Sequence, residues 1–369
     1  MTAKTIKLFS ERSHYSRQHR SELADILRPF WKDMPFSDEE RKAVYGIFPE
    51  EFRLVDNLPE SDLAVLPMTW NHYMRQGQCS QSARFIELAR QAMKPVLSYI
   101  SGDEGVTVRS AFDDVFVVRP SGQLSRRRPR QFAQPVFFDD PLKRYPAQAS
   151  GLVTAAVSAR PTVGFCGQAS VSAARAATDI VRTACRNLLY RIGLRREEPQ
   201  PLFSSALLRA RAMKVLAESP LVETRFIPRA QYRGGAASPE AREATTREFY
   251  QNIAQSDYTL CVRGGGNFSK RFYETLAMGR IPVMIDTDCL LPFEPELDWA
   301  KFIVRVPRQR LHSLPKAVAD HFAGLGNSAL VELKSACRRL WEEELTFGGF
   351  HRHLIRIILT SGSPPVTRC

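Results

Sequence analysis

Residues 258–285 contain the pattern that most restricts the fold of this chain. An apolar run over 258–262 is followed by three consecutive glycines, by a segment of helical periodicity over 269–278, and by a second apolar run over 281–285. A strand, a tight turn, a helix and a strand within about 30 residues have the length of one βαβ unit, whose two strands lie parallel. The segment therefore predicts a parallel sheet covered by helices.

The same alternation continues on both sides of this segment. Further apolar runs that predict strands lie at residues 162–166, 222–227 and 302–306. Segments with helical periodicity lie at residues 171–192, 241–254, 314–322 and 328–345. The first part of the chain has shorter apolar runs at residues 5–9, 63–66, 96–100 and 115–118. Both parts are expected to be α/β units.

The length of 369 residues indicates two domains, because one domain usually takes roughly 150 residues. A segment of small residues, 151–161, ends in Arg-Pro and marks the boundary. We assign residues 1–155 to an N-terminal domain and residues 156–345 to a C-terminal domain. Residues 346–369 are expected to form a helix that packs back on the N-terminal domain. Two domains leave a cleft between them.

The glycine-rich turn has the chemistry of a phosphate site. Its backbone N–H groups at Gly264, Gly265 and Gly266 are open to an anion, and Ser269 is suited to the N-cap of the following helix. The positive end of a helix dipole at the carboxyl end of a parallel strand favours phosphate. Three cations flank the turn: Arg263, Lys270 and Arg271.

The helix after the turn has two faces with different chemistry. Phe272 and Leu276 are spaced to face the sheet, whereas Arg271 and Glu274 lie three apart on a second face that can border the cleft. A carboxylate on that face suits the hydroxyls of a ribose, and the arginine suits a diphosphate. The alternative is an ordinary ion pair on the helix surface.

These motifs resemble the C-terminal signature of exostosin-type glycosyltransferases. The matching residues are Arg263, Gly264, Ser269, Arg271, Tyr273, Glu274, Gly279, Ile281, Pro282 and Val283. The similarity continues through residues 291–293 and 298–299, and a weaker similarity includes Gly167. The resemblance implies a GT-B fold, two Rossmann-like domains facing across a cleft. It also implies a nucleotide-sugar donor on the C-terminal domain, an acceptor on the N-terminal domain, and an inverting reaction without metal.

An inverting transfer needs a general base that deprotonates the acceptor hydroxyl. Asp103 and Glu104 follow the apolar run at 96–100, at a strand end that should face the cleft, so we favour these two carboxylates. An ordinary acidic turn is the alternative for both. His72 is the next candidate for the base, with a structural role near aromatic residues as its alternative.

No metal or other cofactor is expected. The only Asp-x-Asp, at Asp286 and Asp288, lies where the resemblance places a short acidic loop, and the cations around the turn can neutralise a leaving diphosphate. The seven cysteines are scattered, which argues against a disulfide framework or a zinc site and favours a reducing compartment. Without an apolar leader or membrane span, a cytoplasmic location is expected, with peripheral contact to a membrane.

The net charge of +13 favours anionic partners. Residues 125–130 form a basic loop with Arg126, Arg127, Arg128 and Arg130, which either grips an anionic acceptor or is a solvated connection. We expect a glycan or lipid-linked acceptor rather than nucleic acid, because no nucleic-acid-binding motif is present. A glycan- or nucleic-acid-binding protein without catalytic activity is the alternative function.

Overall fold

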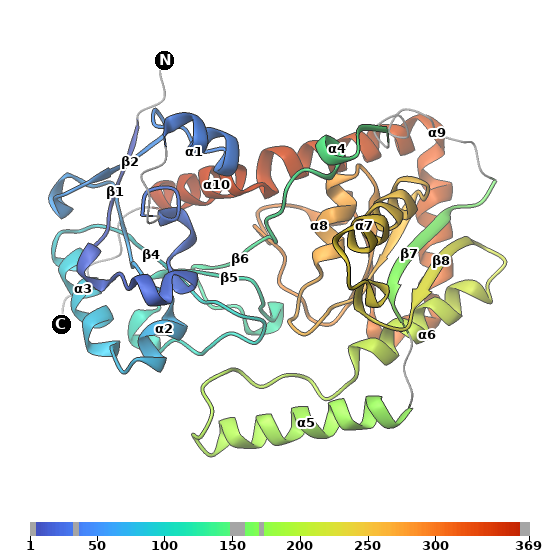
Figure 1. Cartoon of the computed structure of the whole chain (residues 1–369), viewed down its shortest axis with the longest axis horizontal. Coiled ribbons are helices and arrows are strands. Elements are labelled where there is room, and N and C mark those ends of the chain that lie inside the picture. Colours follow the sequence, from blue (N-terminus) through green and yellow to red (C-terminus); the bar gives the residue numbers. More distant parts are fainter. Residues whose placement is uncertain (1–4, 32–36, 148–158, 170–172, 362–369) are drawn as a thin grey trace.

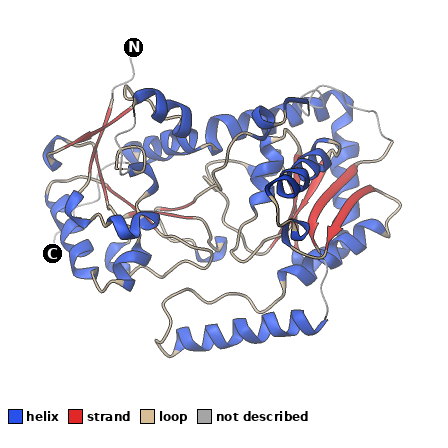
Figure 2. Cartoon of the chain, in the orientation of Figure 1, coloured by secondary structure: helices blue, strands red, loops and turns tan. Residues whose placement is uncertain are grey.

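The computed structural model describes residues 5–31, 37–147, 159–169 and 173–361 of the chain. These residues form two α/β domains that lie side by side (Figure 1). Figure 2 shows that each domain has a central sheet with helices around it. The predicted boundary near residue 155 lies outside the described residues.

The first domain contains a six-stranded, fully parallel sheet in the order β2-β1-β3-β4-β5-β6. Its strands are β1 (Ile6–Phe9), β2 (Phe52–Val55), β3 (Leu63–Val65), β4 (Val96–Tyr99), β5 (Phe116–Arg119) and β6 (Gln131–Ala133). Its helices are α1 (Asp38–Tyr45), α2 (Trp70–Arg75) and α3 (Cys79–Gln91), and α4 (Pro141–Arg144) lies on the connection to the second domain. In α3, Ala89 lies four positions after Phe85 and three after Ile86, and these side chains bury one face of the helix.

The second domain contains a five-stranded, fully parallel sheet in the order β11-β10-β9-β7-β8. Its strands are β7 (Thr162–Gln168), β8 (Glu223–Arg229), β9 (Tyr258–Cys261), β10 (Ile281–Asp286) and β11 (Val304–Pro307). Its helices are α5 (Ala173–Arg191), α6 (Ser205–Ala217), α7 (Pro239–Ala254), α8 (Lys270–Ala277) and α9 (Leu314–Leu340). The two helices expected at 314–322 and 328–345 are joined in α9, with a kink at Gly326, whose φ is 64°.

The two sheets share one topology. In each, the second strand lies beside the first, and the third strand lies on the other side of the first. The strand order therefore reverses between β1 and β3 and between β7 and β9, and such switch points are where open α/β sheets bind ligands. Two Rossmann-like domains that border one cleft constitute a GT-B fold, which confirms the predicted fold class.

The last helix, α10 (Phe347–Thr360), belongs to the core of the first domain although it follows the second in sequence. Phe350, Leu354, Ile355 and Ile358 are buried against that core. Burial of each such side chain contributes about 1.5–3 kcal/mol, so α10 is a substantial tie between the domains. None of the described helices is long and apolar enough to cross a membrane.

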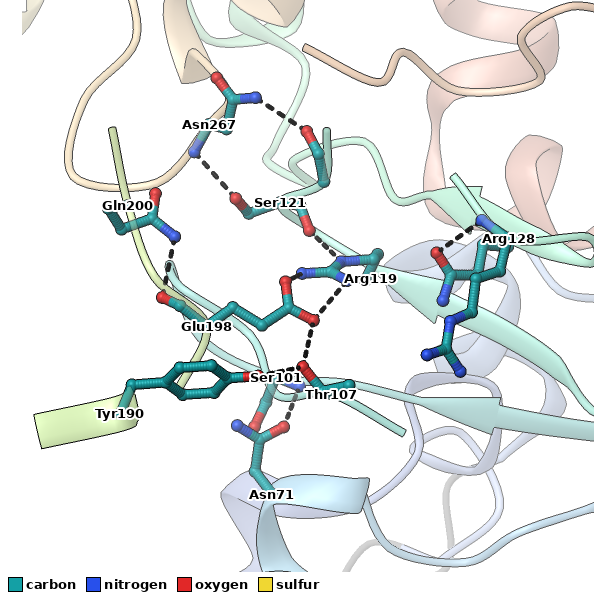
Figure 3. Close-up of polar contacts among 12 residues, drawn as sticks. Asn71, Ser101, Thr107, Arg119, Ser121, Arg128, Tyr190, Glu198, Gln200 and Asn267 are labelled. Atoms are coloured by element: carbon teal, nitrogen blue, oxygen red, sulfur yellow. Dashed lines mark hydrogen bonds and ion pairs between the residues drawn. The ribbon is translucent and has the colours of Figure 1, made fainter. Parts of the chain in front are cut away.

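Polar contacts fix the two domains against each other on one side of the cleft (Figure 3). The backbone N–H of Asn267 donates to the hydroxyl of Ser121 at 2.8 Å, and its side-chain amide donates to the carbonyl of Gly122 at 2.8 Å. The guanidinium of Arg119 pairs with the carboxylate of Glu198 at 2.7 Å. Asn267 lies in the loop between β9 and α8, so the glycine-rich turn is held by both domains.

Candidate functional site

A cavity of about 850 Å³ opens at the carboxyl ends of β7 and β9. It lies at the switch point of the second sheet, and its volume falls within the roughly 300–1,000 Å³ of small-molecule sites. Most of its lining comes from the ends of β7, β8 and β9 and from α6, α7 and α8. Asp103, Asp139 and Arg144 of the preceding part of the chain complete the wall. The cavity is therefore shared by both domains.

The glycine-rich turn borders this cavity, and its glycines serve close approach. Gly264, Gly265 and Gly266 have no left-handed φ angle. A Cβ on Gly265 would lie 2.9 Å from Asp103 Oδ2, and one on Gly266 would lie 2.7 Å from the Asp103 carbonyl oxygen. Small residues are thus needed where the loop after β4 meets the turn, a contact that sequence periodicity does not show.

The N-terminus of α8 faces the cavity through Ser269, Lys270 and Arg271. Ser269 occupies the N-cap, as expected, but its hydroxyl accepts no hydrogen bond from the helix. The N–H groups of the first turn therefore have no side-chain cap, and they carry the partial positive charge of the helix end. This arrangement favours an anionic ligand.

Arg271 lies in the cavity floor with a carbonyl partner instead of a carboxylate. Its Nη2 donates to the Cys166 carbonyl at 2.8 Å, and its guanidinium lies 4.1 Å from the ring centroid of Phe165. A Cβ on Gly167 would lie 2.6 Å from the same Nη2, so glycine at this position makes room for the arginine. Burial lowers the pKa of Arg271.

Arg209, on α6, is the second cation with only carbonyl partners. It donates to the Gln168 carbonyl at 2.6 Å. Burial and then the charge of Arg271 lower its pKa to about 10, so it stays charged at neutral pH. Among the described residues, no carboxylate pairs with Arg209 or Arg271, and the buried Nε atom of each has no hydrogen-bond partner. Two half-buried cations without carboxylate partners, beside a helix N-terminus, form a candidate anion site.

Two other arginines of the cavity are paired with carboxylates. Arg229 binds the carboxylate of Glu248 at 2.5 Å, and Arg144 binds Glu243. These pairs leave little net charge to attract a ligand. Among the described residues, the arginines of the lining without a carboxylate partner are Arg209, Arg242 and Arg271, and Arg271 lies in the first turn of α8.

Glu274 lines the same cavity but differs from expectation in its surroundings. Its side chain is only 7% exposed, so it is not a freely exposed residue on the helix surface. It accepts a hydrogen bond from the Tyr250 hydroxyl at 3.2 Å and pairs with Lys270 at 3.3 Å. The alternative considered for this residue, a surface ion pair with Arg271, does not form, because Glu274 pairs with Lys270. A ribose-binding role for Glu274 stays a prediction.

Arg263 does not have the position expected of a phosphate ligand. It is 6% exposed and does not line the large cavity. Its guanidinium donates to Gln200 at 2.9 Å, to the Gly265 carbonyl at 3.0 Å and to Asn267 at 3.3 Å. Arg263 therefore braces the glycine-rich turn from behind.

The three candidates for the general base occupy different environments. Asp103 is exposed on the cavity wall. Glu104 instead pairs with Arg186 at 2.9 Å and with Arg195 at 2.5 Å, and it does not line the cavity. The structure thus separates two carboxylates that the sequence placed together.

His72 is buried in α2 and does not line the cavity. Its ring packs edge-on against His19 and Tyr73, and burial, followed by His19, lowers its pKa. This position corresponds to the structural alternative for a histidine near aromatic residues. Its buried Nδ1 has no hydrogen-bond partner among the described residues.

Sequence reasoning missed Arg209, Asp139 and Asn267. Arg209 lies in an ordinary helical segment, and Asp139 lies in a short acidic connection before α4, so neither belongs to a recognisable motif. Asn267 directly follows the three glycines, and this adjacency was the one available signal. Its amide also donates to the Asp288 carbonyl at 2.9 Å.

The two carboxylates of the Asp-x-Asp motif have separate partners. Asp286 pairs with Arg305 at 3.1 Å, whereas Asp288 accepts hydrogen bonds from the backbone and hydroxyl of Ser125. Within the described ranges, no group of three or more His, Cys, Asp or Glu side chains is placed to hold a metal ion. Metal independence stays a prediction.

Three arginines of the basic loop contact their own domain. Arg127 donates to the Gln131 carbonyl, Arg128 pairs with Asp113 at 3.1 Å, and Arg130 donates to the Asp114 carbonyl. None of the loop's four arginines lines the cavity. These contacts favour a structural connection over a grip on an anionic acceptor.

The fold and the cavity define a class: a two-domain α/β protein of GT-B type with an anion site at the switch point of its second domain. Residues 195–321 match the model of the Exostosin GT47 domain. This segment includes β9, the glycine-rich turn and α8, and the match confirms the resemblance to exostosin-type glycosyltransferases that the sequence showed.

One curated relative supports the same family. The Exostosin-1 homolog of Caenorhabditis elegans is 29% identical over 112 residues, which are 30% of this chain and 28% of the relative. The match thus spans little more than a quarter of the relative's length.

Solved structures that align over most of the chain include a glycosyltransferase from Rickettsia africae, with 10% identity, coverage of 96% of this chain and 98% of that one, and a TM-score of 0.37. Another is Anabaena HepE in complex with UDP, with 9% identity, coverage of 96% and 100%, and a TM-score of 0.37.

Proposed function

We propose that this chain transfers a sugar from a nucleoside-diphosphate sugar to a hydroxyl group of an acceptor. The observation that carries the proposal is the anion site: Arg209 and Arg271, without carboxylate partners, lie beside the uncapped N-terminus of α8. That site lies within an exostosin GT47 domain. A diphosphate has the charge and the acceptor oxygens that these donors require.

The donor's diphosphate would lie over the first turn of α8, with Arg271 below it and Arg209 at its side. The ribose would then lie further along α8, where Glu274 can accept hydrogen bonds from its hydroxyls. The arginines and the helix end would stabilise the charge that develops on the leaving nucleoside diphosphate. We therefore propose that the reaction needs no metal ion.

The acceptor would enter from the side of the first domain. Asp103 is the base that we favour, because it is exposed on the cavity wall where the loop after β4 meets the glycine-rich turn. The acceptor oxygen attacks the anomeric carbon while its proton passes to the Asp103 carboxylate, and the bond from that carbon to the diphosphate breaks. A single displacement of this kind inverts the anomeric configuration. A glycan or lipid-linked hydroxyl is the proposed acceptor class.

A panel of UDP, GDP and TDP sugars tests the proposal. Thermal unfolding should shift upward with one nucleotide class, because a ligand that binds the folded state raises its stability. The same class should release nucleoside diphosphate when an oligosaccharide or lipid-linked hydroxyl acceptor is added. Binding without any release across the acceptor panel would favour a glycan-binding protein without catalytic activity. Absence of binding would contradict the proposal itself.

A further inference from the structure

Helix α5 projects from the second domain and lies to one side of both domains (Figure 1). Contacts near its C-terminal end attach it to the rest of the chain. The Tyr190 hydroxyl lies 3.1 Å from that of Thr107, and Arg186 pairs with Glu104. The side chain of Asn187 donates to the Gln200 carbonyl at 2.7 Å. One side of α5 therefore faces the protein, and its opposite side faces outward.

The outward side of α5 is apolar. Positions three, four and seven apart share one face of a helix. On α5 and its immediate continuation, this rule groups the exposed residues Ala174, Ala177, Val181, Ala184, Cys185, Leu188 and Ile192. Val181 is 61% exposed, and Leu188 and Ile192 are each 58% exposed. The polar side chains of Asn187 and Tyr190 face the protein instead.

Residues 181–202, which include the three large apolar side chains of this face, concentrate exposed apolar surface. Six of the eleven exposed large apolar side chains in the described part of the chain lie within residues 181–202. They are Val181, Leu188, Leu189, Ile192, Leu194 and Leu202. Contiguous exposed apolar surface indicates a site of interaction with a protein or a membrane.

The charged residues around this face favour a membrane over a protein partner. Arg186 and Arg195 pair with Glu104 on the protein side, and the other positively charged residues from 182 to 196 are Arg182, Arg191 and Arg196, which are exposed. Asp179 is the one acidic residue of α5. A second copy of this helix would bring arginines close to arginines, which is unfavourable, whereas an anionic lipid surface complements them.

We propose that α5 is an interfacial helix that binds the surface of an anionic lipid bilayer. Its apolar face enters the region between headgroups and acyl chains, and the flanking arginines contact lipid phosphates. The helix is thereby a peripheral membrane anchor. The inference does not depend on the proposed function, because it uses no residue of the cavity.

Co-sedimentation of the full chain with vesicles tests this proposal. Vesicles of phosphatidylcholine with phosphatidylserine should bind the protein at least about tenfold more tightly than vesicles of phosphatidylcholine alone, and added salt should weaken the binding. The triple variant Val181→Asp, Leu188→Asp, Ile192→Asp should lose at least about tenfold in vesicle affinity, because charged residues cannot enter the interface without cost. All three side chains are exposed, so the fold should survive.

The matched control is Val44→Asp with Leu221→Asp, which alters exposed apolar residues elsewhere and should leave vesicle binding unchanged. Unfolding temperatures of all variants report on the fold, and the vesicle measurement does not involve nucleotide. Equal vesicle binding by the triple variant and the wild type would overturn the proposal. So would a wild type that binds no vesicles but forms a dimer that the triple variant abolishes, which would assign the face to a second copy.

Discussion

The two domains have the same strand order, yet the carboxyl edges of their sheets differ in chemistry. In the second domain that edge is a cavity with Arg209 and Arg271 lacking carboxylate partners. In the first domain, polar residues that follow β3 and β4 form hydrogen bonds with another side chain of the protein. The Glu22 carboxylate accepts hydrogen bonds from Thr69 at 2.5 Å and Ser101 at 2.6 Å.

Glu22 shows how the first domain neutralises its edge. Burial raises the pKa of Glu22, but the hydrogen bonds from Ser101 and Thr69 and the charge of Arg75 outweigh burial and lower it overall. The topology brings strand ends together in both domains, and the side chains decide whether the edge is structural or binds a ligand. This contrast predicts that charge changes at the cavity affect function, whereas charge changes around Glu22 affect stability.

The largest effect is expected from a change at Asp103, the residue of the first domain that we propose as the general base. Asp103→Asn should reduce sugar transfer by at least ~100-fold, the low end for loss of a general base, with donor affinity nearly unchanged. Kinetics of nucleoside diphosphate release and calorimetry measure the two quantities. Asp139→Asn is the matched control, since Asp139 is also exposed on the cavity. If Asp139→Asn loses sugar transfer and Asp103→Asn does not, Asp139 is the base instead of Asp103.

Arg271→Met should weaken nucleoside diphosphate binding by about 3 kcal/mol, or more than a hundredfold, because charge-assisted hydrogen bonds to the diphosphate are lost. Arg271→Lys should restore part of the affinity by restoring the charge. Arg75→Met makes the equivalent change in the first domain, where it leaves Glu22 without its ion pair. That variant should lower the unfolding temperature and leave nucleotide affinity unchanged. If Arg75→Met and Arg271→Met lost equal nucleotide affinity, the proposed difference between the two domains would be wrong.

Glu274→Ala should weaken nucleoside diphosphate binding by about 1.5 to 3 kcal/mol, or roughly tenfold to more than a hundredfold. The unfolding temperature should also fall, because Tyr250 and Lys270 lose their partner. A 2′,3′-dideoxy nucleotide should bind the wild type more weakly but lose little further affinity in the variant. Additive losses in this four-member cycle would mean that Glu274 does not contact the ribose. Glu248→Ala, which also breaks an ion pair of this domain, controls for stability.

Glu22 should stabilise the first domain at neutral pH and contribute less to its stability in acid. The folded-state pKa of Glu22 lies below its usual value of 4.5, so its stabilising contribution is present above that pH and is lost as the pH falls through the folded pKa. Glu22→Gln should lower the unfolding temperature by about 2–4 °C at neutral pH and by less in acid. A constant difference between the two proteins at all pH values would contradict this explanation.

The smallest expected effect is that of metal removal. EDTA should change donor affinity by less than about twofold, because Arg209, Arg271 and the end of α8 supply the positive charge. A requirement for Mg²⁺ or Mn²⁺ would overturn this prediction and return Asp286 and Asp288 to consideration as ligands. Calorimetry with and without EDTA provides the measurement.

Local sequence patterns predicted the parts of the molecule that depend on local structure. The run of apolar, glycine and helical residues at 258–285 contains β9, α8 and β10, and it contributes Ser269, Lys270, Arg271 and Glu274 to the cavity together. One βαβ unit fixes where these residues lie relative to each other, so their spacing was informative.

Tertiary contacts decided what the sequence did not reveal. Asp103 and Glu104 are neighbours, but Arg186 and Arg195 approach only Glu104, from a helix and loop far along the chain. Arg209 reaches the cavity from α6 with no motif around it. The direction of Arg263 depends on Gln200, which periodicity cannot place. Side-chain direction and long-range pairing therefore limited the prediction of the site.

A crystal structure of the chain with UDP tests the central claim most directly. The account predicts the diphosphate over the first turn of α8, within hydrogen-bond distance, about 3 Å, of the Arg271 guanidinium and the backbone N–H groups of that turn. The ribose hydroxyls should face Glu274. A nucleotide bound at the carboxyl edge of the first sheet, beside Glu22, would contradict the account.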